Sequence, residues 1–139
     1  MIIIDASTAL GWVMDERTTL ETEAALDAVT ESGDGLVPPN FIAEFINGLI
    51  RAERRKRIDQ SVTSRAILQI EGLELSVDLP DPHKVAAIAR EHQLTAYDAS
   101  YLALAIQHRA PVCTNDATLA RAARSQNLLW TPPKKKREK

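Results

Sequence analysis

The sequence predicts an α/β fold in which helices cover both faces of a parallel sheet. Short apolar runs alternate along the chain with segments of helical periodicity, the order expected of strand–helix–strand units. The clearest apolar runs lack the alternation of a half-exposed strand, which is typical of strands buried on both faces. A length of 139 residues, with 45% hydrophobic and 26% charged residues, is that of one globular domain. We place this domain at residues 1–131 and expect the basic residues 132–139 to form a disordered tail.

The first third of the chain contains two predicted strands and two predicted helices. Residues 1–4 are apolar and rich in β-branched side chains, so they form the first strand. Helices follow at residues 6–14 and 18–31, and the second one stops at a Gly-Asp-Gly sequence. Residues 36–37 are a second strand, which Pro38–Pro39 ends.

The middle of the chain is predicted to be mainly helical. Asn40 is a suitable N-cap for a long helix from Phe41 to about Arg57. Apolar residues at helical spacing mark the next helix at residues 62–73, and residues 75–77 form a short strand.

The last third alternates again between helices and strands. Helices are expected around residues 85–89, 97–107 and 119–123. Residues 111–113 form a strand between the last two helices, and residues 128–130 a final one. The alternation therefore continues to the end of the predicted domain.

We expect a cytoplasmic protein. No apolar run reaches the ~20 residues needed to cross a bilayer, and the N-terminus lacks the basic region of a signal peptide. Cys113 is the only cysteine, so no internal disulfide can form, which fits a reducing compartment. The net charge of -2 does not by itself indicate a nucleic-acid-binding protein.

Glu44 lies in a segment that is otherwise almost entirely apolar. In the run from Phe41 to Ile50, only Glu44 and Asn47 are strongly polar, and their spacing puts them on one helical face. A buried carboxylate is costly unless it is paired, hydrogen-bonded or bound to a cation. The alternative is that this face meets solvent.

Three aspartates occupy comparable positions. Asp98 is the only charged residue in the helical run 96–106, although stabilisation of a helix N-terminus would also explain it. Asp5 and Asp116 follow predicted strands, where open α/β sheets bind ligands, but either could be a helix N-cap instead. One such acid is weak evidence of a site, but these three aspartates together with Glu44 predict one.

These four acids predict metal-assisted phosphodiester hydrolysis. Carboxylates brought together raise one another's pKa, so at neutral pH they need cations. Oxygen ligands without cysteine or clustered histidine suit Mg²⁺ or Mn²⁺, which can polarise a phosphodiester and activate water. Ser7, Thr114 and Asn115 stand beside the acids and are expected to orient them or bound water.

The runs around these acids resemble those of PIN-domain ribonucleases, particularly the VapC-type toxins of toxin–antitoxin pairs. The matching runs are MIIIDAS at the N-terminus, PNFIAEFINGL around Glu44, TAYDASYLALA around Asp98 and VCTNDATLARAA around Asp116. The resemblance extends over residues 1–131, and the Asp98 run followed by the Asp116 run is its most specific part.

The resemblance implies a PIN-like parallel sheet of about five strands in the order 3-2-1-4-5. It also implies that an acidic metal site, catalytic and occupied by Mg²⁺ or Mn²⁺, is formed by Asp5, Glu44, Asp98 and Asp116. Asn47 and Thr114 would support this site. A homodimer and neutralisation by a small antitoxin are further expectations.

The predicted function is that of a metal-dependent endoribonuclease acting as a toxin. A PIN nuclease that processes RNA without an antitoxin remains the alternative. We reject a Mg²⁺-binding receiver module, which places an acceptor aspartate after a mid-chain strand and a lysine after a late one. Here the strand at 36–37 ends in Pro-Pro, and Cys113 leads to Thr-Asn-Asp.

A basic stretch follows Glu44 on the same predicted helix. Arg51, Arg54 and Arg55 are candidates for contacts with RNA phosphates. Alternatively, these cations complement the negative end of the helix dipole.

Overall fold

The computed structural model describes residues 1–134 and shows the predicted alternation of strands and helices. In chain order the elements are β1 (Ile2–Ile4), α1 (Ala6–Val13), η1 (Asp15–Arg17), α2 (Leu20–Ser32), β2 (Gly35–Val37), α3 (Phe41–Arg54), α4 (Gln60–Gly72), β3 (Ser76–Val77), α5 (Pro82–His92), α6 (Ala96–His108), β4 (Val112–Cys113) and α7 (Ala117–Ser125). The turn of 3-10 helix η1 was not predicted. Most of the predicted basic tail, from residue 135 on, lies outside the described residues.

The sheet is parallel, with four strands in the order β3-β2-β1-β4. The central strand is β1, in which Ile3 lies opposite Leu36 of β2 on one side and Val112 of β4 on the other. This arrangement confirms the predicted order of the first four strands. It also brings the carboxyl ends of β1 and β4 side by side.

The predicted fifth strand at residues 128–130 is the exception. Leu129 forms a single parallel bridge with Val112, in the position beside β4 that a fifth strand would take. Pro132 and Pro133 follow almost at once, and proline has no backbone N–H to extend a ladder. The expectation of five strands is therefore corrected to four strands and a bridge.

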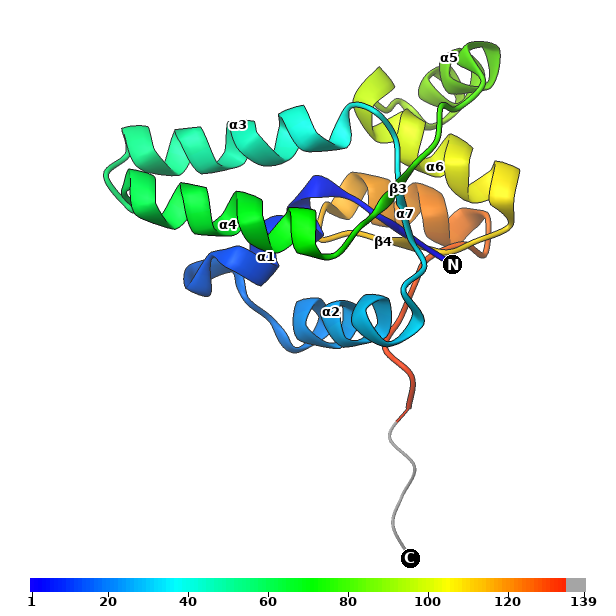
Figure 1. Cartoon of the computed structure of the whole chain (residues 1–139). Helices are drawn as coiled ribbons and strands as arrows, with labels where there is room; N and C mark the ends of the chain where they lie inside the picture. The colour runs from blue at the N-terminus through cyan, green and yellow to red at the C-terminus, as the bar shows by residue number, and fades with distance from the viewer. Residues whose placement is uncertain (135–139) are drawn as a thin grey trace, which may run out of the picture.

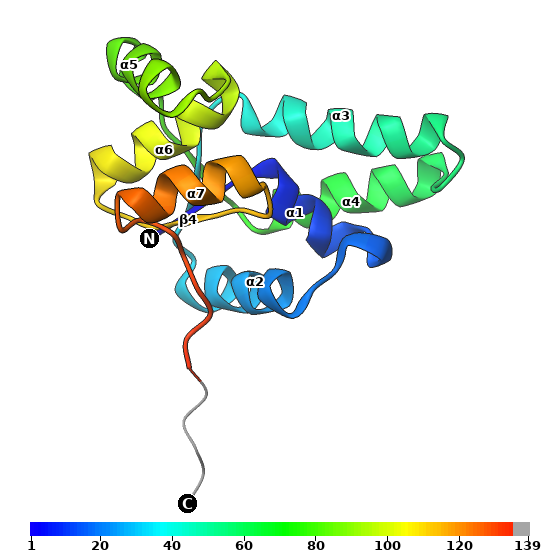
Figure 2. The same ribbon diagram turned by 180° about the vertical axis from the view of Figure 1, so that it is seen from behind.

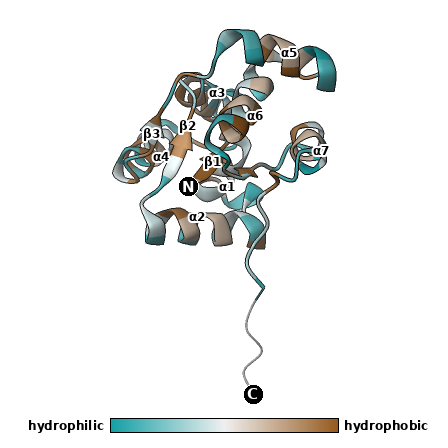
Figure 3. Ribbon diagram, turned by 90° about the vertical axis from the view of Figure 1, so that its right-hand side faces the viewer, coloured by the Kyte–Doolittle hydropathy of each residue, from teal (hydrophilic) through white to brown (hydrophobic). Residues whose placement is uncertain are grey.

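Helices cover both faces of the sheet. In Figure 1, α2 lies below the strands, whereas α3, α5 and α6 lie above them, and Figures 2 and 3 show the same order. The hydrophobic strands β1 and β2 are enclosed at the centre of Figure 3. Ile3, Ile4 and Val112 are fully buried, as predicted for strands covered on both faces.

Polar side chains cap most of the described helices, among them the three that begin beside predicted site acids. Asp5, Thr95 and Asp116 each accept a hydrogen bond from a backbone N–H in the first turn of α1, α6 and α7, respectively. Such a cap stabilises a helix by about 1 kcal/mol. Asp5 and Asp116 are thus N-caps as well as predicted site acids.

Helix α3 begins at Phe41 as predicted, but it lacks the predicted capping bond and ends earlier than predicted. Asn40 stands at its N-cap position, but its backbone is already helical there and its side chain makes no capping bond. Its amide Nδ2 donates to the Glu44 carboxylate. The helix ends at Arg54 rather than near Arg57, because Lys56 adopts a left-handed conformation with φ of 57°.

Close packing between α1 and α3 sets the distance between the N-terminal acid and Glu44. A Cβ atom on Gly48 of α3 would lie 2.4 Å from the Leu10 Cδ1 atom of α1. Leu10 is buried, so a larger residue at position 48 would push the two helices apart. Gly48 therefore allows the approach that brings Glu44 toward the start of α1.

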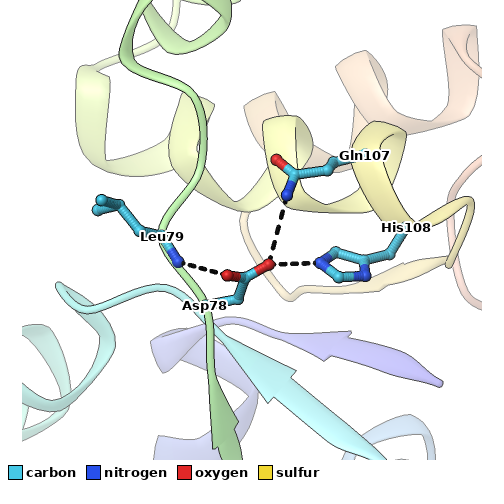
Figure 4. Close-up of polar contacts among 4 residues, drawn as sticks. All are labelled: Asp78, Leu79, Gln107 and His108. Atoms are coloured by element: carbon cyan, nitrogen blue, oxygen red, sulfur yellow. Dashed lines mark hydrogen bonds and ion pairs between the residues drawn. The ribbon is translucent and has the colours of Figure 1, made fainter.

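Asp78 ties the end of β3 to the C-terminal end of α6 (Figure 4). Its Oδ2 atom lies 2.7 Å from His108 Nε2 and accepts a longer hydrogen bond of 3.3 Å from Gln107 Nε2. Its Oδ1 atom accepts from the Leu79 backbone N–H at 2.9 Å. This contact steadies the helix whose opposite end carries Asp98.

Within residues 1–134, none of the helices combines the length and the apolar character that crossing a membrane requires.

Candidate active site

Asp5 is the most deeply buried of the four acids, with 3% of its surface exposed. Its Oδ1 atom accepts hydrogen bonds from the Ser7 hydroxyl at 2.8 Å and from the Thr8 backbone N–H at 2.9 Å. Burial raises the pKa of Asp5. The hydrogen bonds to its carboxylate lower the pKa, and the bond from Thr114 has the largest lowering effect. The carboxylate is therefore held in one orientation by several donors.

Thr114 links two of the acids. Its hydroxyl donates to Asp5 Oδ2 and accepts from the Asp116 backbone N–H at 2.9 Å. Ser7 reinforces this link, because its hydroxyl accepts from the Asn115 backbone N–H at 2.9 Å. Figure 2 shows the resulting arrangement, with the first turn of α7 beside α1.

Asp116 and Asp98 both lie in the first turn region of a helix. Asp116 caps α7 through Oδ2, which accepts from the Leu119 N–H at 2.8 Å. Asp98 follows the cap residue Thr95 by three positions, and in the described residues its side chain accepts no hydrogen bond. Each acid thus stands at a favourable end of a helix dipole, but only Asp116 is a cap.

Burial and neighbouring charge raise the pKa of Asp98. Burial is the larger cause, and the negative charges of Asp116 and then Asp5 add to it. These charges act on Asp98 from two strand ends, so the fold gathers the three aspartates at one place.

Glu44 joins the same group from α3. Burial raises its pKa, hydrogen bonds from Tyr101 and Asn40 lower it, and the charge of Asp98 raises it further. Both donors bind the same oxygen: Tyr101 Oη lies 2.8 Å and Asn40 Nδ2 lies 2.6 Å from Glu44 Oε2. The alternative that Glu44 simply faces solvent does not hold, because its carboxylate is half-buried and its Oε2 atom accepts both of these hydrogen bonds.

The sequence analysis missed the role of Tyr101. Tyr101 is only 1% exposed and lies one helical turn beyond Asp98 on α6. Burial and the nearby charge of Glu44 raise the pKa of Tyr101, so its hydroxyl stays protonated. The hydroxyl can therefore donate a hydrogen bond to Glu44. The signal was available, because a buried tyrosine needs a hydrogen-bond partner and this one shares a helical face with an acid.

Three of the predicted supporting residues lie at the site, and one does not. Ser7, Thr114 and Asn115 are all within the hydrogen-bond network of Asp5. Asn47 is exposed, and its side chain forms no hydrogen bond within residues 1–134. The amide that supports Glu44 comes from Asn40, one turn before it, rather than from Asn47, nearly one turn after it.

The acidic cluster has no cationic partner of its own. Among the ion pairs formed by residues 1–134, none involves any of the four site acids. Several carboxylate oxygens also have no protein donor there: Glu44 Oε1, Asp116 Oδ1 and both oxygens of Asp98. Negative charge is therefore concentrated where nothing in the described chain neutralises it.

This donor set fits a hard divalent cation such as Mg²⁺ or Mn²⁺. Carboxylate oxygens are the ligands these ions prefer, and a cation would relieve the repulsion that raises the pKa of Asp98. In residues 1–134, no three His, Cys, Asp or Glu side chains are close enough to enclose an ion in their present positions. An ion would therefore draw the acidic side chains together.

The basic candidates lie apart from this cluster. Arg51, Arg54 and Arg55 are exposed at the C-terminal end of α3, and no ion pair within residues 1–134 involves them. Arg57, just beyond, is paired with Glu16 at 3.1 Å.

Comparisons with known proteins agree with this fold. The model of the family described as "PIN domain" matches residues 2–125. Among solved structures, the chain is similar to the crystal structure of PAE2754 from Pyrobaculum aerophilum, with a TM-score of 0.69 and 24% identity over 88% of this chain and 84% of that one. No curated protein matches the sequence. The chain therefore belongs to the PIN-domain family, whose fold is that of nucleases.

Proposed function

We propose that this protein is a metal-dependent endoribonuclease, and that it acts as the toxin of a toxin–antitoxin pair. The observation that carries the enzymatic part is the gathering of Asp5, Glu44, Asp98 and Asp116. The charges of Asp116 and Asp5 raise the pKa of Asp98, the charge of Asp98 raises the pKa of Glu44, and no ion pair within residues 1–134 involves any of the four acids. The PIN-domain fold supports a nuclease. RNA as the substrate and the role as a toxin rest on the resemblance of the acidic runs to VapC-type toxins.

The four acids would hold Mg²⁺ or Mn²⁺ mainly through the oxygens that no protein donor occupies. When bound, such an ion supplies charge neutralisation at the scissile phosphate and activation of water. The chain's own contribution is orientation. Thr114, Ser7 and the Thr8 N–H fix Asp5, while Tyr101 and Asn40 fix Glu44 Oε2 and leave its Oε1 for an ion or a proton.

Cleavage of RNA by the purified protein tests the enzymatic proposal. We expect cleavage with Mg²⁺ or Mn²⁺ that stops in EDTA and is lost in Asp116→Asn. Asp27→Asn, which removes an exposed charge from α2, is the matched control and should cleave like the wild type. Cleavage that persists in EDTA, or equally in Asp116→Asn, would exclude the proposed site.

Expression in cells separates a toxin from an RNA-processing nuclease. Inducing the gene alone should arrest growth and create new RNA ends, and co-expressing the small gene next to it should prevent both. If the neighbouring gene has no effect and only a few precursor RNAs change, the protein is a processing nuclease without an antitoxin.

We further propose that the protein is a cytoplasmic homodimer. Exposed apolar side chains support a protein interface: Ile42, Val77 and Leu79 are 42%, 63% and 69% exposed. They line two neighbouring pockets that share Pro39. Sedimentation of the wild type should give twice the mass of the chain, and Val77→Asp with Leu79→Asp should give the monomer. A monomeric wild type would exclude the dimer.

A further inference from the structure

A cavity of about 540 Å³ lies next to the acidic cluster. Its walls are formed by Ser7, Arg17, Thr19, Asn115 and Asp116. The volume is within the roughly 300–1,000 Å³ of pockets that hold small ligands. Asp116 belongs to both the cavity and the acidic cluster, so a molecule in the cavity lies beside the proposed reacting centre.

Arg17 is the one cationic side chain in the wall of this cavity. It is exposed, and no ion pair formed within residues 1–134 involves it, although Asp116 lines the same space. An arginine that merely compensated Asp116 would be expected within ion-pair distance of it. Its guanidinium group instead remains available to an anion, and its planar fork suits a phosphate.

The segment that carries Arg17 is held in place on both sides. The Thr18 hydroxyl donates to the backbone carbonyls of Gly11 at 2.8 Å and Met14 at 3.2 Å, which anchors the turn η1 to α1. Immediately after it, Thr19 and Thr22 form a capping box at the start of α2. Because the backbone on either side is fixed, Arg17 is presented to the cavity from a defined position.

Other residues that line the cavity offer polar groups for the rest of a nucleotide. The Asn115 side chain is exposed at the cavity, and its backbone N–H is fixed by the Ser7 hydroxyl at 2.9 Å. Its amide is therefore available as both donor and acceptor for a ribose or a base edge. The helices α2 and α7 begin at Thr19 and Asp116, so their positive ends also border the cavity.

We propose that this cavity is a nucleotide subsite in which Arg17 binds a backbone phosphate that flanks the scissile one. The proposal rests on the proposed ribonuclease function and adds a contact that the basic end of α3 does not supply. Single-stranded RNA enters across Ser7 and Asn115, with the scissile phosphate at the four acids and a neighbouring phosphate at Arg17.

Single uncharged methylphosphonate linkages test this contact. The cut is first mapped on a DNA oligonucleotide with one ribonucleotide at the cleavage position, and each flanking phosphate is then neutralised in turn. For the wild type, kcat/KM should fall about ten- to hundredfold at one flanking position, the worth of a hydrogen-bonded charge contact. Arg17→Ala should show the same loss on the unmodified substrate and no further loss at that position.

Two variants complete the experiment. Arg17→Lys should lose less activity than Arg17→Ala, because lysine retains the positive charge but cannot form the paired hydrogen bonds of a guanidinium group. Arg90→Ala, which removes an exposed cation from α5, should behave like the wild type. The subsite is excluded if Arg17→Ala has the same kcat/KM as Arg90→Ala. It is also excluded if Arg17→Ala lowers kcat/KM by the same factor on every methylphosphonate substrate.

Binding separates the subsite from the function on which it rests. In EDTA, the logarithm of the affinity for single-stranded RNA should fall less steeply with salt for Arg17→Ala, by about 0.7 in slope for one lost phosphate contact. If the wild type cleaves no RNA, the ribonuclease proposal fails, and this slope alone decides on Arg17. An unchanged slope overturns the phosphate contact.

Discussion

The Tyr101 hydroxyl donates a hydrogen bond of 2.8 Å to Glu44 Oε2, and the two residues are 57 positions apart in the chain. Tyr101 comes from α6 and Glu44 from α3, so this bond joins the two helices that contribute acids to the site. It also fixes which oxygen of Glu44 is turned inward. The proposed active site thus depends on a residue that carries no charge itself.

Tyr101→Phe should alter the pH dependence of cleavage. The bond stabilises ionised Glu44, so its loss raises the pKa of Glu44 and moves the acidic limb of the kcat/KM profile to higher pH. The free energy of unfolding should fall by about 1–3 kcal/mol. Tyr97→Phe is the matched control, since Tyr97 is 62% exposed on the same helix. Identical pH profiles for the two variants would show that Tyr101 has only a packing role.

Asp98→Asn should abolish cleavage while the fold survives. The change keeps the shape of the side chain but removes the charge of a proposed metal ligand, so activity should fall by orders of magnitude. Without metal, the variant should melt at a higher temperature than the wild type, because repulsion by Asp116 and Asp5 is relieved. If Asp98 only complements the helix dipole, stability should instead drop by about 0.3–1 kcal/mol with turnover unchanged. Kinetics and thermal melts on one preparation distinguish these outcomes.

The stability of the metal-free protein should decrease as pH rises toward neutrality. The folded-state pKa of Asp98 is raised above its ordinary value of 3.8, so the native state binds this proton more tightly than the unfolded state. The resulting penalty is absent below about pH 3.8, grows as pH rises toward the raised pKa and is complete above it. Melts of the wild type and Asp98→Asn in EDTA, from about pH 4 to pH 8, measure it by difference. A difference independent of pH would contradict the raised pKa.

Added Mg²⁺ should reverse this penalty in the wild type. Binding to the native state alone raises stability by RT ln(1 + [L]/Kd), so the melting temperature should climb with Mg²⁺ concentration. Asp98→Asn should respond less. Equal Mg²⁺ responses in the two proteins would place the ion elsewhere.

Arg51 and Arg55 should contribute more to RNA binding than the basic tail. They lie seven and eleven residues beyond Glu44, close to whole turns, at roughly 10 and 17 Å along the helix axis. Replacing both with alanine should flatten the salt dependence of RNA binding by about 0.7 per lost contact. Ending the chain at Pro133 should flatten it less. A larger effect of the truncation would assign the main phosphate contacts to the tail.

The sequence alone was sufficient to predict the acids and the framework that carries them. Helical periodicity and short continuous apolar runs are local properties, so they place Glu44 on a helix and Asp5 after a buried strand without knowledge of the rest of the chain. A charge in an apolar run is equally visible locally, because its burial would be costly without a partner. Strand order followed from the family resemblance, and the structure confirms it for four strands.

Only the tertiary structure decided which neutral residues serve those acids. Thr114 and Asp5 are 109 positions apart, and their contact depends on β1 and β4 being adjacent. Asn40 rather than Asn47 reaches Glu44, because the position of α3 against its neighbours leaves Asn47 in solvent. Helical periodicity shows which residues share a face of a helix, but it does not show which residues that face contacts. Those contacts are set by packing between segments that are distant in the sequence. For the same reason Arg17, an ordinary surface residue by sequence, lines a cavity beside Asp116.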